Sequence, residues 1–140
     1  LVLSSPNHPL AHDGEIAVRR GANLPGIPRH NLKVMATRAL GPAQVGVSVA
    51  SVSGQSLRGD EAGLLAPLDG FATVSLTGEY AVRRGVTLVA RVMNLFDARY
   101  ETFGLLGDAV DVLGVDFDDP RFVGPGAPRA AWVGVTLSFR

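Results

Sequence analysis

The sequence has no cysteine and no net charge, and each of these absences excludes a class of protein. The lack of cysteine removes disulfide frameworks, thiolate zinc sites and thiol nucleophiles. Thirteen Lys and Arg residues are balanced by thirteen Asp and Glu residues, so no basic excess can hold a nucleic-acid backbone. With 140 residues, the chain is one domain at most, or part of a larger one.

The chain also lacks an apolar run long enough for a membrane-spanning helix, which needs about 20 residues. The longest charge-free candidate, 39–57, is interrupted by Pro42 and diluted by serine and glutamine. The sequence opens at Leu1 rather than Met, and no basic segment precedes an apolar core, so we expect no signal peptide. We expect either that the start has been removed or that the sequence begins inside a longer protein.

What the sequence has instead is apolar residues that alternate with polar or small ones. Seventeen Gly and nine Pro punctuate the chain, and the segments between them show no helical spacing. A period of two is typical of a pleated strand with one apolar face. The pattern predicts an all-β fold, an antiparallel up-and-down meander of about five strands within 31–53, 69–96 and 129–139.

The connections between these strands alternate between short and long. Short turns are predicted at 41–42 and 83–85, whereas 54–68 and 97–128 are long and 1–30 precedes the first strand. The strands match the length of about 9–11 residues that a tilted membrane-spanning strand needs. Outer-membrane barrels have short periplasmic turns and longer extracellular loops. The pattern therefore favours part of a transmembrane β-barrel, with 1–30, 54–68 and 97–128 as extracellular loops.

The third and fourth predicted strands are expected to pair as a hairpin. A one-residue slip would mix their apolar and polar faces, so the register is well specified. The expected pairs are Val82 with Val86, Tyr80 with Leu88, Leu76 with Val92, and Thr77 with Arg91. In a barrel the Val, Leu and Ala residues face lipid, and the polar residues, including Lys33, Glu79 and Arg91, face the lumen. Periodicity alone also allows the reverse, a soluble protein that buries the apolar face.

Four motifs occur in order along the chain. They are 24–30 (LPGIPRH, with Pro25, Gly26, Pro28 and His30), 53–62 (SGQSLRGDEA), 92–100 (VMNLFDARY, with Asn94, Leu95, Phe96, Asp97 and Tyr100), and 128–139 (PRAAWVGVTLSF). The set resembles TonB-dependent outer-membrane receptors. In that family 24–30 is similar to the entry of an earlier strand, 53–62 to a loop of one branch, 92–100 to the penultimate strand, and 128–139 to the terminal strand.

This resemblance implies that the chain is the C-terminal part of a barrel of about 22 strands, incomplete on its own. The family's N-terminal plug fills the barrel, and its TonB box couples it to the inner-membrane complex; neither is present in this sequence. Family substrates are usually ferric siderophores, and sometimes cobalamin, haem or sugars. The resemblance implies a location in the bacterial outer membrane, with lipid, the rest of the barrel and the plug as partners. The barrel-assembly machinery recognises a terminal aromatic residue in the family, whereas here Arg140 follows Phe139.

Other functions stay open: a porin-like channel without a plug, a soluble all-β binding domain, or a non-functional gene remnant. No catalytic set stands out, so we expect no enzyme, no cofactor and no metal site. Arg58 is a candidate contact for an anionic substrate, and 58–60 also spells the adhesion tripeptide RGD. The acidic residues of 108–119 suggest either a calcium site or, more simply, a solvated loop.

Three further sets of residues have a structural explanation beside a functional one. His8, His12 and His30 are expected to be loop residues rather than metal ligands, because no carboxylate completes a set. Arg91 and Glu79 are expected to pair across strands or to contact a plug, rather than to line a permeation path. Trp132 is expected to pack on the polar side of its strand or to contact a plug.

Overall fold

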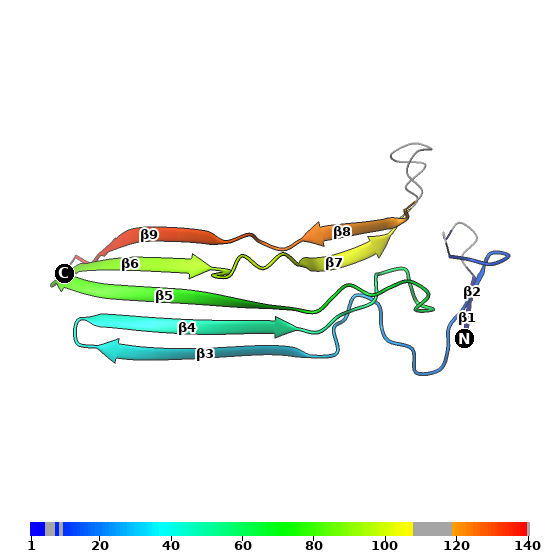
Figure 1. Cartoon of the computed structure of the whole chain (residues 1–140), viewed down its shortest axis with the longest axis horizontal. Helices are drawn as coiled ribbons and strands as arrows, with labels where there is room; N and C mark the ends of the chain where they lie inside the picture. The colour runs from blue at the N-terminus through cyan, green and yellow to red at the C-terminus, as the bar shows by residue number, and fades with distance from the viewer. Residues whose placement is uncertain (5–7, 9, 108–118, 140) are drawn as a thin grey trace. The chain divides into compact units, whose positions relative to one another are not determined.

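The computed structural model describes residues 1–4, 8, 10–107 and 119–139 (Figure 1). The chain divides into two units. The first, called the loop unit below, comprises Leu1–Arg29, Ser53–Gly70 and Tyr100–Gly126. The second, called the sheet unit, comprises His30–Val52, Phe71–Arg99 and Ala127–Arg140.

The sheet unit is a single antiparallel sheet of five strands. Its strands lie in the order β3 (Asn31–Leu40), β4 (Ala43–Val52), β5 (Phe71–Arg83), β6 (Val86–Met93) and β9 (Ala130–Leu137) (Figure 1). Every neighbouring pair is antiparallel. The predicted meander is therefore confirmed. The sheet is open, with β3 and β9 at its edges.

The hairpin of β5 and β6 has the predicted register except next to its turn. Leu76 pairs with Val92, Thr77 with Arg91, and Tyr80 with Leu88. The predicted pairing of Val82 with Val86 is wrong, because Arg83 pairs with Val86 and the register shifts between Ala81 and Arg83. Gly85 has a positive φ of 79°, which suits a tight two-residue hairpin turn, and the extra residue is accommodated as an irregularity in β5.

The register gives the sheet two faces of different chemistry, because directly opposed residues share a face. The apolar face is made of six successive rows of register partners that run across the strands. From the border with the tight turns to the opposite border, these rows are Val86–Leu137; Leu40–Ala43–Tyr80–Leu88–Val135; Arg38–Val45–Gly78–Ala90–Val133; Ala36–Val47–Leu76–Val92–Ala131; Val34–Val49–Val74; and Leu32–Ser51–Ala72. The polar face carries the alternate residues, which include Lys33, Thr37, Gln44, Gly46, Ser48, Thr73, Ser75, Thr77, Glu79, Arg91, Trp132 and Thr136.

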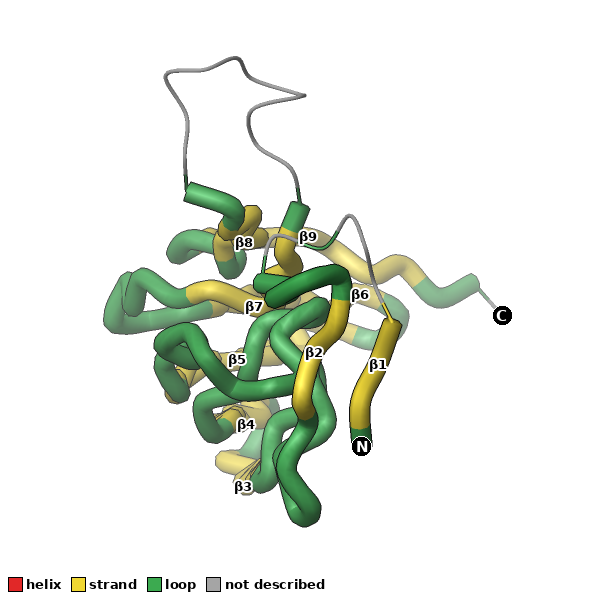
Figure 2. The backbone as a smooth tube through the Cα atoms, turned by 90° about the vertical axis from the view of Figure 1, so that its right-hand side faces the viewer, coloured by secondary structure: helices red, strands yellow, loops and turns green. Residues whose placement is uncertain are grey.

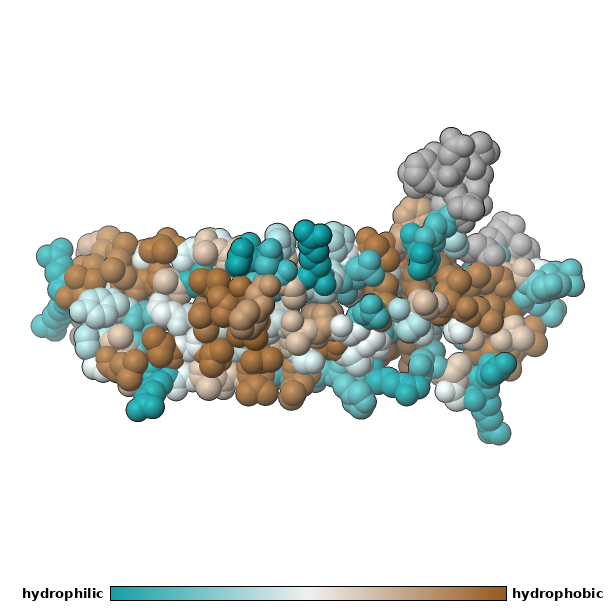
Figure 3. Space-filling view, in the orientation of Figure 1, coloured by the Kyte–Doolittle hydropathy of each residue, from teal (hydrophilic) through white to brown (hydrophobic). Residues whose placement is uncertain are grey.

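The described residues of the sheet unit form no hydrophobic core of their own. The buried hydrophobic side chains of the described residues are Ile16, Leu57 and Leu68, and all three belong to the loop unit. On the apolar face, by contrast, Val135 is 57% exposed. Hydrophobic residues accordingly gather on the surface over the sheet (Figure 3). A water-soluble sheet covers its apolar face with a second layer, and the described strands have none.

No helix in the described part of the chain is long and apolar enough to cross a membrane.

The loop unit contains four short strands where the sequence predicts only loops. β1 (Val2–Ser4) pairs with β2 (Glu15–Ala17), and β7 (Glu101–Leu106) pairs with β8 (Arg121–Pro125), all antiparallel (Figure 2 shows β1 beside β2). β7 also contacts the segment 53–70 through its backbone, because the Arg58 N–H donates to Gly104 O and the Leu106 N–H donates to Arg58 O, both at 2.8 Å. The segments of this unit therefore form one packed body.

A cluster of polar side chains joins the end of β6 to the start of β9. Asn94 is buried, and its Nδ2 donates to Ala98 O at 2.9 Å and to Ala127 O at 3.0 Å. Its Oδ1 accepts from the Ala98 N–H at 2.9 Å, and Asp97 Oδ1 accepts from the Arg129 N–H at 3.0 Å. Asn94 and Asp97 both have positive φ, at 47° and 54°, which Asn and Asp tolerate better than most residues. We call this cluster the clamp; it fixes the distance between the two ends of the long connection 98–127.

The polar face is closely packed at Gly46. A Cβ atom there would lie 2.6 Å from Thr77 Oγ1 and 3.2 Å from Thr37 Cγ2, whereas a Cβ at Gly78 would have no atom within 4 Å. We expect Gly46→Val to lower the free energy of unfolding of the full-length protein by about 1–3 kcal/mol, as overpacking does. Gly78→Val, the matched control, should be neutral or slightly stabilising, because valine favours strands. Denaturant midpoints in detergent measure both, and equal midpoints would contradict the close packing.

The clamp gives a second prediction. Asn94→Ala removes three hydrogen bonds of a buried side chain and should lower the free energy of unfolding by about 1–3 kcal/mol. Asn31→Ala, at the exposed start of β3, is the control and should change little. Asn94→Gly keeps a residue suited to positive φ but loses the bonds, so wild-type stability in that variant would show that the clamp contributes nothing.

Candidate functional site

Each of the three segments of the loop unit continues in sequence into strands of the sheet, and all three do so at the same end of the sheet. Asn31 pairs with Val52 and Val52 with Phe71, while Met93 pairs with Ala130, so these strand ends form one border of the sheet. The tight turns at 41–42 and 84–85 lie at the opposite border. Long connections are thus confined to one end of the strands. The candidate ligand-contacting residues lie at that end or on the polar face.

On the polar face, one row of residues crosses all five strands. Thr37, Gly46, Thr77, Arg91 and Trp132 are successive register partners. Arg91 therefore lies between Thr77 on β5 and Trp132 on β9, which places a cation and an aromatic ring side by side. Within the described strands, no ion pair joins Arg91 to Glu79. The cross-strand neighbours of Arg91 are thus the hydroxyl of Thr77 and the indole of Trp132, rather than the carboxylate of Glu79.

The first motif, 24–30, lies where the first segment of the loop unit ends, at Arg29, and the first segment of the sheet unit begins, at His30. Gly26 has a φ of 71°, and its N–H donates to Ser56 O at 2.8 Å within the loop unit. Pro25 and Pro28 are half-buried, and His30 directly precedes β3. This motif holds the first segment against 53–70, a contact between residues that are distant in sequence.

The residues of the 92–100 motif have separate roles. Asn94 and Asp97 form the clamp, and the Leu95 N–H donates to Val74 O at 2.8 Å. Phe96 is exposed, while the ring of Tyr100 occupies the space that a side chain at Gly126 would need. The motif therefore ends β6 and anchors the loop that follows, which the sequence alone does not reveal.

Arg58 and Asp60 lie close in sequence but differ in accessibility. Asp60 is 1% exposed, and its two carboxylate oxygens accept from the N–H groups of Leu64 and Leu65 at 2.8 and 3.0 Å. A buried carboxylate is inaccessible to an adhesion receptor, so the RGD tripeptide 58–60 does not act as an adhesion motif here. Arg58 is exposed, and both of its backbone groups are bound to β7. Its side chain is thus carried by a fixed backbone.

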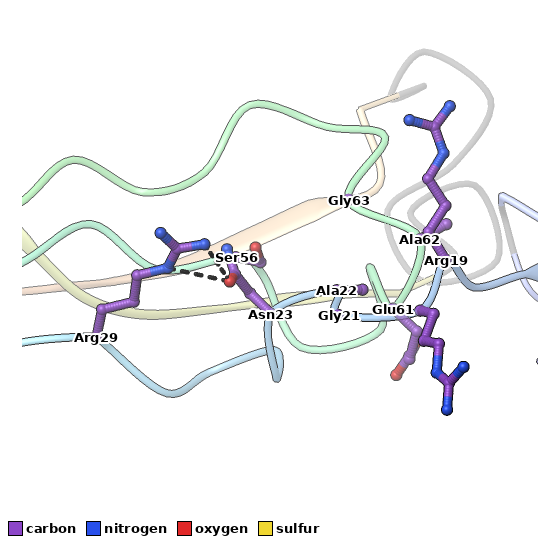
Figure 4. A pocket seen from close by; sticks show the side chains of 10 residues that line it. Arg19, Gly21, Ala22, Asn23, Arg29, Ser56, Glu61, Ala62 and Gly63 are labelled. Atoms are coloured by element: carbon purple, nitrogen blue, oxygen red, sulfur yellow. Dashed lines mark hydrogen bonds between the residues drawn. The ribbon is translucent and has the colours of Figure 1, made fainter.

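A pocket of about 300 Å³ opens on the loop unit (Figure 4). Its lining includes Arg19, Arg20 and Arg29 together with Glu61. Arg29 donates to Asn23 Oδ1 at 3.0 and 2.5 Å, and Figure 4 shows Arg19 and Arg29 at opposite ends of the lining. The guanidinium groups of Arg19 and Arg29 do not converge on one point, so these two arginines do not form a focused anion site.

The candidate metal ligands are separated in the structure. Among the described residues, no three His, Asp or Glu side chains group as a metal site would require. His8 Nδ1 accepts from the Leu10 N–H at 3.1 Å, and His12 contacts only the exposed Asp13 as an ion-pair partner. Of the acidic run, Asp108, Asp111, Asp116 and Asp118 lie outside the described residues. Asp119 pairs with Arg121 at 2.7 Å, and this hydrogen bond lowers the pKa of Asp119 from 3.8 to about 2.

Phe139 follows the last strand instead of lying within it. β9 ends at Leu137, and the Ser138 N–H donates to Gly85 O at 2.9 Å. Phe139 is 89% exposed, and Arg140 lies outside the described residues. An exposed aromatic ring at this position is accessible to a partner.

Comparison with known proteins identifies the fold. No protein-family model matches the sequence, and no curated protein matches it significantly. The solved structures that match include three receptors or transporters: the siderophore receptor PiuA from Acinetobacter baumannii (17% identity, TM-score 0.64, 81% of this chain), the copper transporter OprC (31%, 0.61, 83%), and the ferric yersiniabactin uptake receptor FyuA from Yersinia pestis (17%, 0.64, 83%).

These matches extend over most of this chain but only part of each structure. The chain spans 14%, 18% and 17% of PiuA, OprC and FyuA, respectively. All three are TonB-dependent receptors, and the matched fold is an open piece of their barrels. The chain therefore shares the fold of a segment of the β-barrel of TonB-dependent receptors.

Proposed function

We propose that this chain forms part of the wall of an outer-membrane active transporter of the TonB-dependent kind. The observation that carries the proposal is the five-stranded sheet with one exposed apolar face, which the described strands leave without a covering layer. Lipid chains are the medium that such a face requires, and the small and polar residues of the opposite face suit a filled or watery lumen. The likeness to receptor barrels supports the same assignment.

The orientation follows from the positions of the connections. The border with the tight turns would face the periplasm, and the loop unit, with 1–30, 54–68 and 97–128, would face outside the cell. The further partners would be the remaining strands, a plug against the polar face, the inner-membrane TonB complex through the plug, and the barrel-assembly machinery at Phe139. A full-length gene that encodes no plug would instead favour a porin-like channel.

The proposed substrate is a ferric siderophore or a similar scarce nutrient. PiuA is by name a siderophore receptor and FyuA a ferric yersiniabactin uptake receptor, which supports iron, whereas the 31% identity to a copper transporter favours copper as a second candidate. Arg58, exposed on a fixed backbone, is the proposed contact for an anionic ligand. Measurement of cellular iron and copper in a deletion strain under limitation of each metal distinguishes the two substrates.

The membrane assignment predicts which residues contact lipid. We expect single nitroxide labels at Val74, Val92 and Val135 in the assembled full-length protein to be accessible to oxygen, which dissolves in acyl chains. Labels at Ser75 and Thr136, one position away on the opposite face, are the matched controls and should not be accessible to oxygen. Electron paramagnetic resonance measures both. Aqueous contact at the valines together with a dry environment at the controls would overturn the proposal.

The loop unit should be required for uptake and not for assembly. Leu57 is 1% exposed at the centre of this unit, and Leu57→Ala should destabilise it by about 2–5 kcal/mol. We expect reduced uptake with an unchanged amount of protein in the outer membrane. Leu64→Ala, in the same segment but 65% exposed, is the control and should transport normally. Equal uptake by the two variants would contradict a role for the packed loop unit in ligand capture.

A further inference from the structure

Two arginines lie on the apolar face, and the five described strands place no carboxylate beside them there. Arg38 on β3 is the register partner of Val45, and Arg83 on β5 is the partner of Val86. The other charged residues of the five described strands, Lys33, Glu79 and Arg91, lie on the polar face. The apolar face therefore carries only positive charge, which is complementary to an anion.

Arg83 reaches this face only because of the irregularity in β5. Uninterrupted alternation from Tyr80 would place Val82 on the apolar face and Arg83 on the opposite one. The register shift between Ala81 and Arg83 pairs Arg83 with Val86, whose own partner on β9 is Leu137. The shift thus moves a cation to the apolar face at the border with the tight turns.

The cost of these charges indicates their depth. An arginine on the lipid face of a barrel is strongly destabilising at the membrane midplane but nearly neutral close to the interface. Arg38 lies two residues before Leu40, the end of β3, a distance of roughly 6.6 Å along the strand. Its long side chain can extend over this distance to the interface. Tyr80 lies in the intervening row, and aromatic residues favour that depth.

A shallow apolar hollow of about 410 Å³ adjoins Arg38. Its lining consists of Ala36, Arg38, Val45, Val47 and Leu76 from the apolar face, with Thr37 and Gly46 beside them. In the row of Arg38, Val45 is followed by Gly78 and Ala90, which add little bulk. The hollow is therefore shaped for a slender apolar group next to a cation.

On the basis of the proposed function, we propose that Arg38 and Arg83 bind the phosphate of a phospholipid headgroup in the periplasmic leaflet. The row of Tyr80 lies between the rows of the two arginines, and an acyl chain of the same lipid occupies the hollow. Arginine suits this ligand because its planar guanidinium donates two parallel hydrogen bonds to phosphate oxygens. The site then converts two charges that are costly on a lipid face into a contact with the lipid itself.

The test measures phospholipid retained by the full-length protein. The protein is inserted into nanodiscs of phosphatidylcholine with phosphatidylglycerol, extracted in mild detergent, and examined by native mass spectrometry. We expect the double variant Arg38→Leu, Arg83→Leu to retain roughly tenfold less phosphatidylglycerol, as the loss of a charged hydrogen-bonding pair predicts. Arg19→Leu, which removes an exposed arginine of the loop unit, is the matched control and should retain the wild-type amount.

Leucine is compatible with the apolar face, so the double variant should still fold, as its heat-modifiable migration on gels reports. If it does not fold, Arg38→Lys keeps the charge but loses the paired donors and should still lower retention. Unchanged retention in a folded, membrane-embedded variant overturns this inference and leaves the proposed function intact. Displacement of the lipid by inorganic phosphate also overturns it, because the site would then bind a free anion. A protein absent from the outer membrane overturns both.

Discussion

A sheet that buries no hydrophobic side chain must obtain its stabilisation from what surrounds it. Folding is driven chiefly by removal of apolar surface from water, and the buried Ile16, Leu57 and Leu68 all lie outside the five strands. Backbone hydrogen bonds hold the strands together but leave both faces of the sheet uncovered. Three features fit a segment of a barrel wall that has lipid on one side and a filled interior on the other. They are the alternation of the two faces, the open edges at β3 and β9, and the long connections at one end of the strands only.

Much of the sheet follows from the sequence because its signal is local. A period of two survives in every long strand, and the opposed apolar residues leave one register for β5 and β6. The exception is instructive: at Val82 the demand of a two-residue turn at Gly85 outweighs the alternation, and the pattern gives no warning of it. The same exception places Arg83 where no periodicity argument would put it.

The loop unit could not be predicted in the same way. Its strands are three to six residues long, too short for alternation to be distinguished from chance. Its core depends on contacts between segments distant in sequence, such as Leu57 against Gly104, which leave no local pattern. Among the site residues, resemblance identified Asn94 and Asp97, but only the structure shows that their hydrogen bonds tie Ala127 and Arg129 to the end of β6.

The open edges have a consequence for anyone who produces this segment by itself. β3 and β9 each present a row of unsatisfied amide and carbonyl groups beside exposed valine and leucine. Natural edge strands are usually shielded by charge, proline or a cover, because a bare edge templates the addition of another copy. Made alone in water, the polypeptide would therefore stack edge to edge into insoluble aggregates, and recovery from inclusion bodies would require its missing neighbours rather than a better buffer.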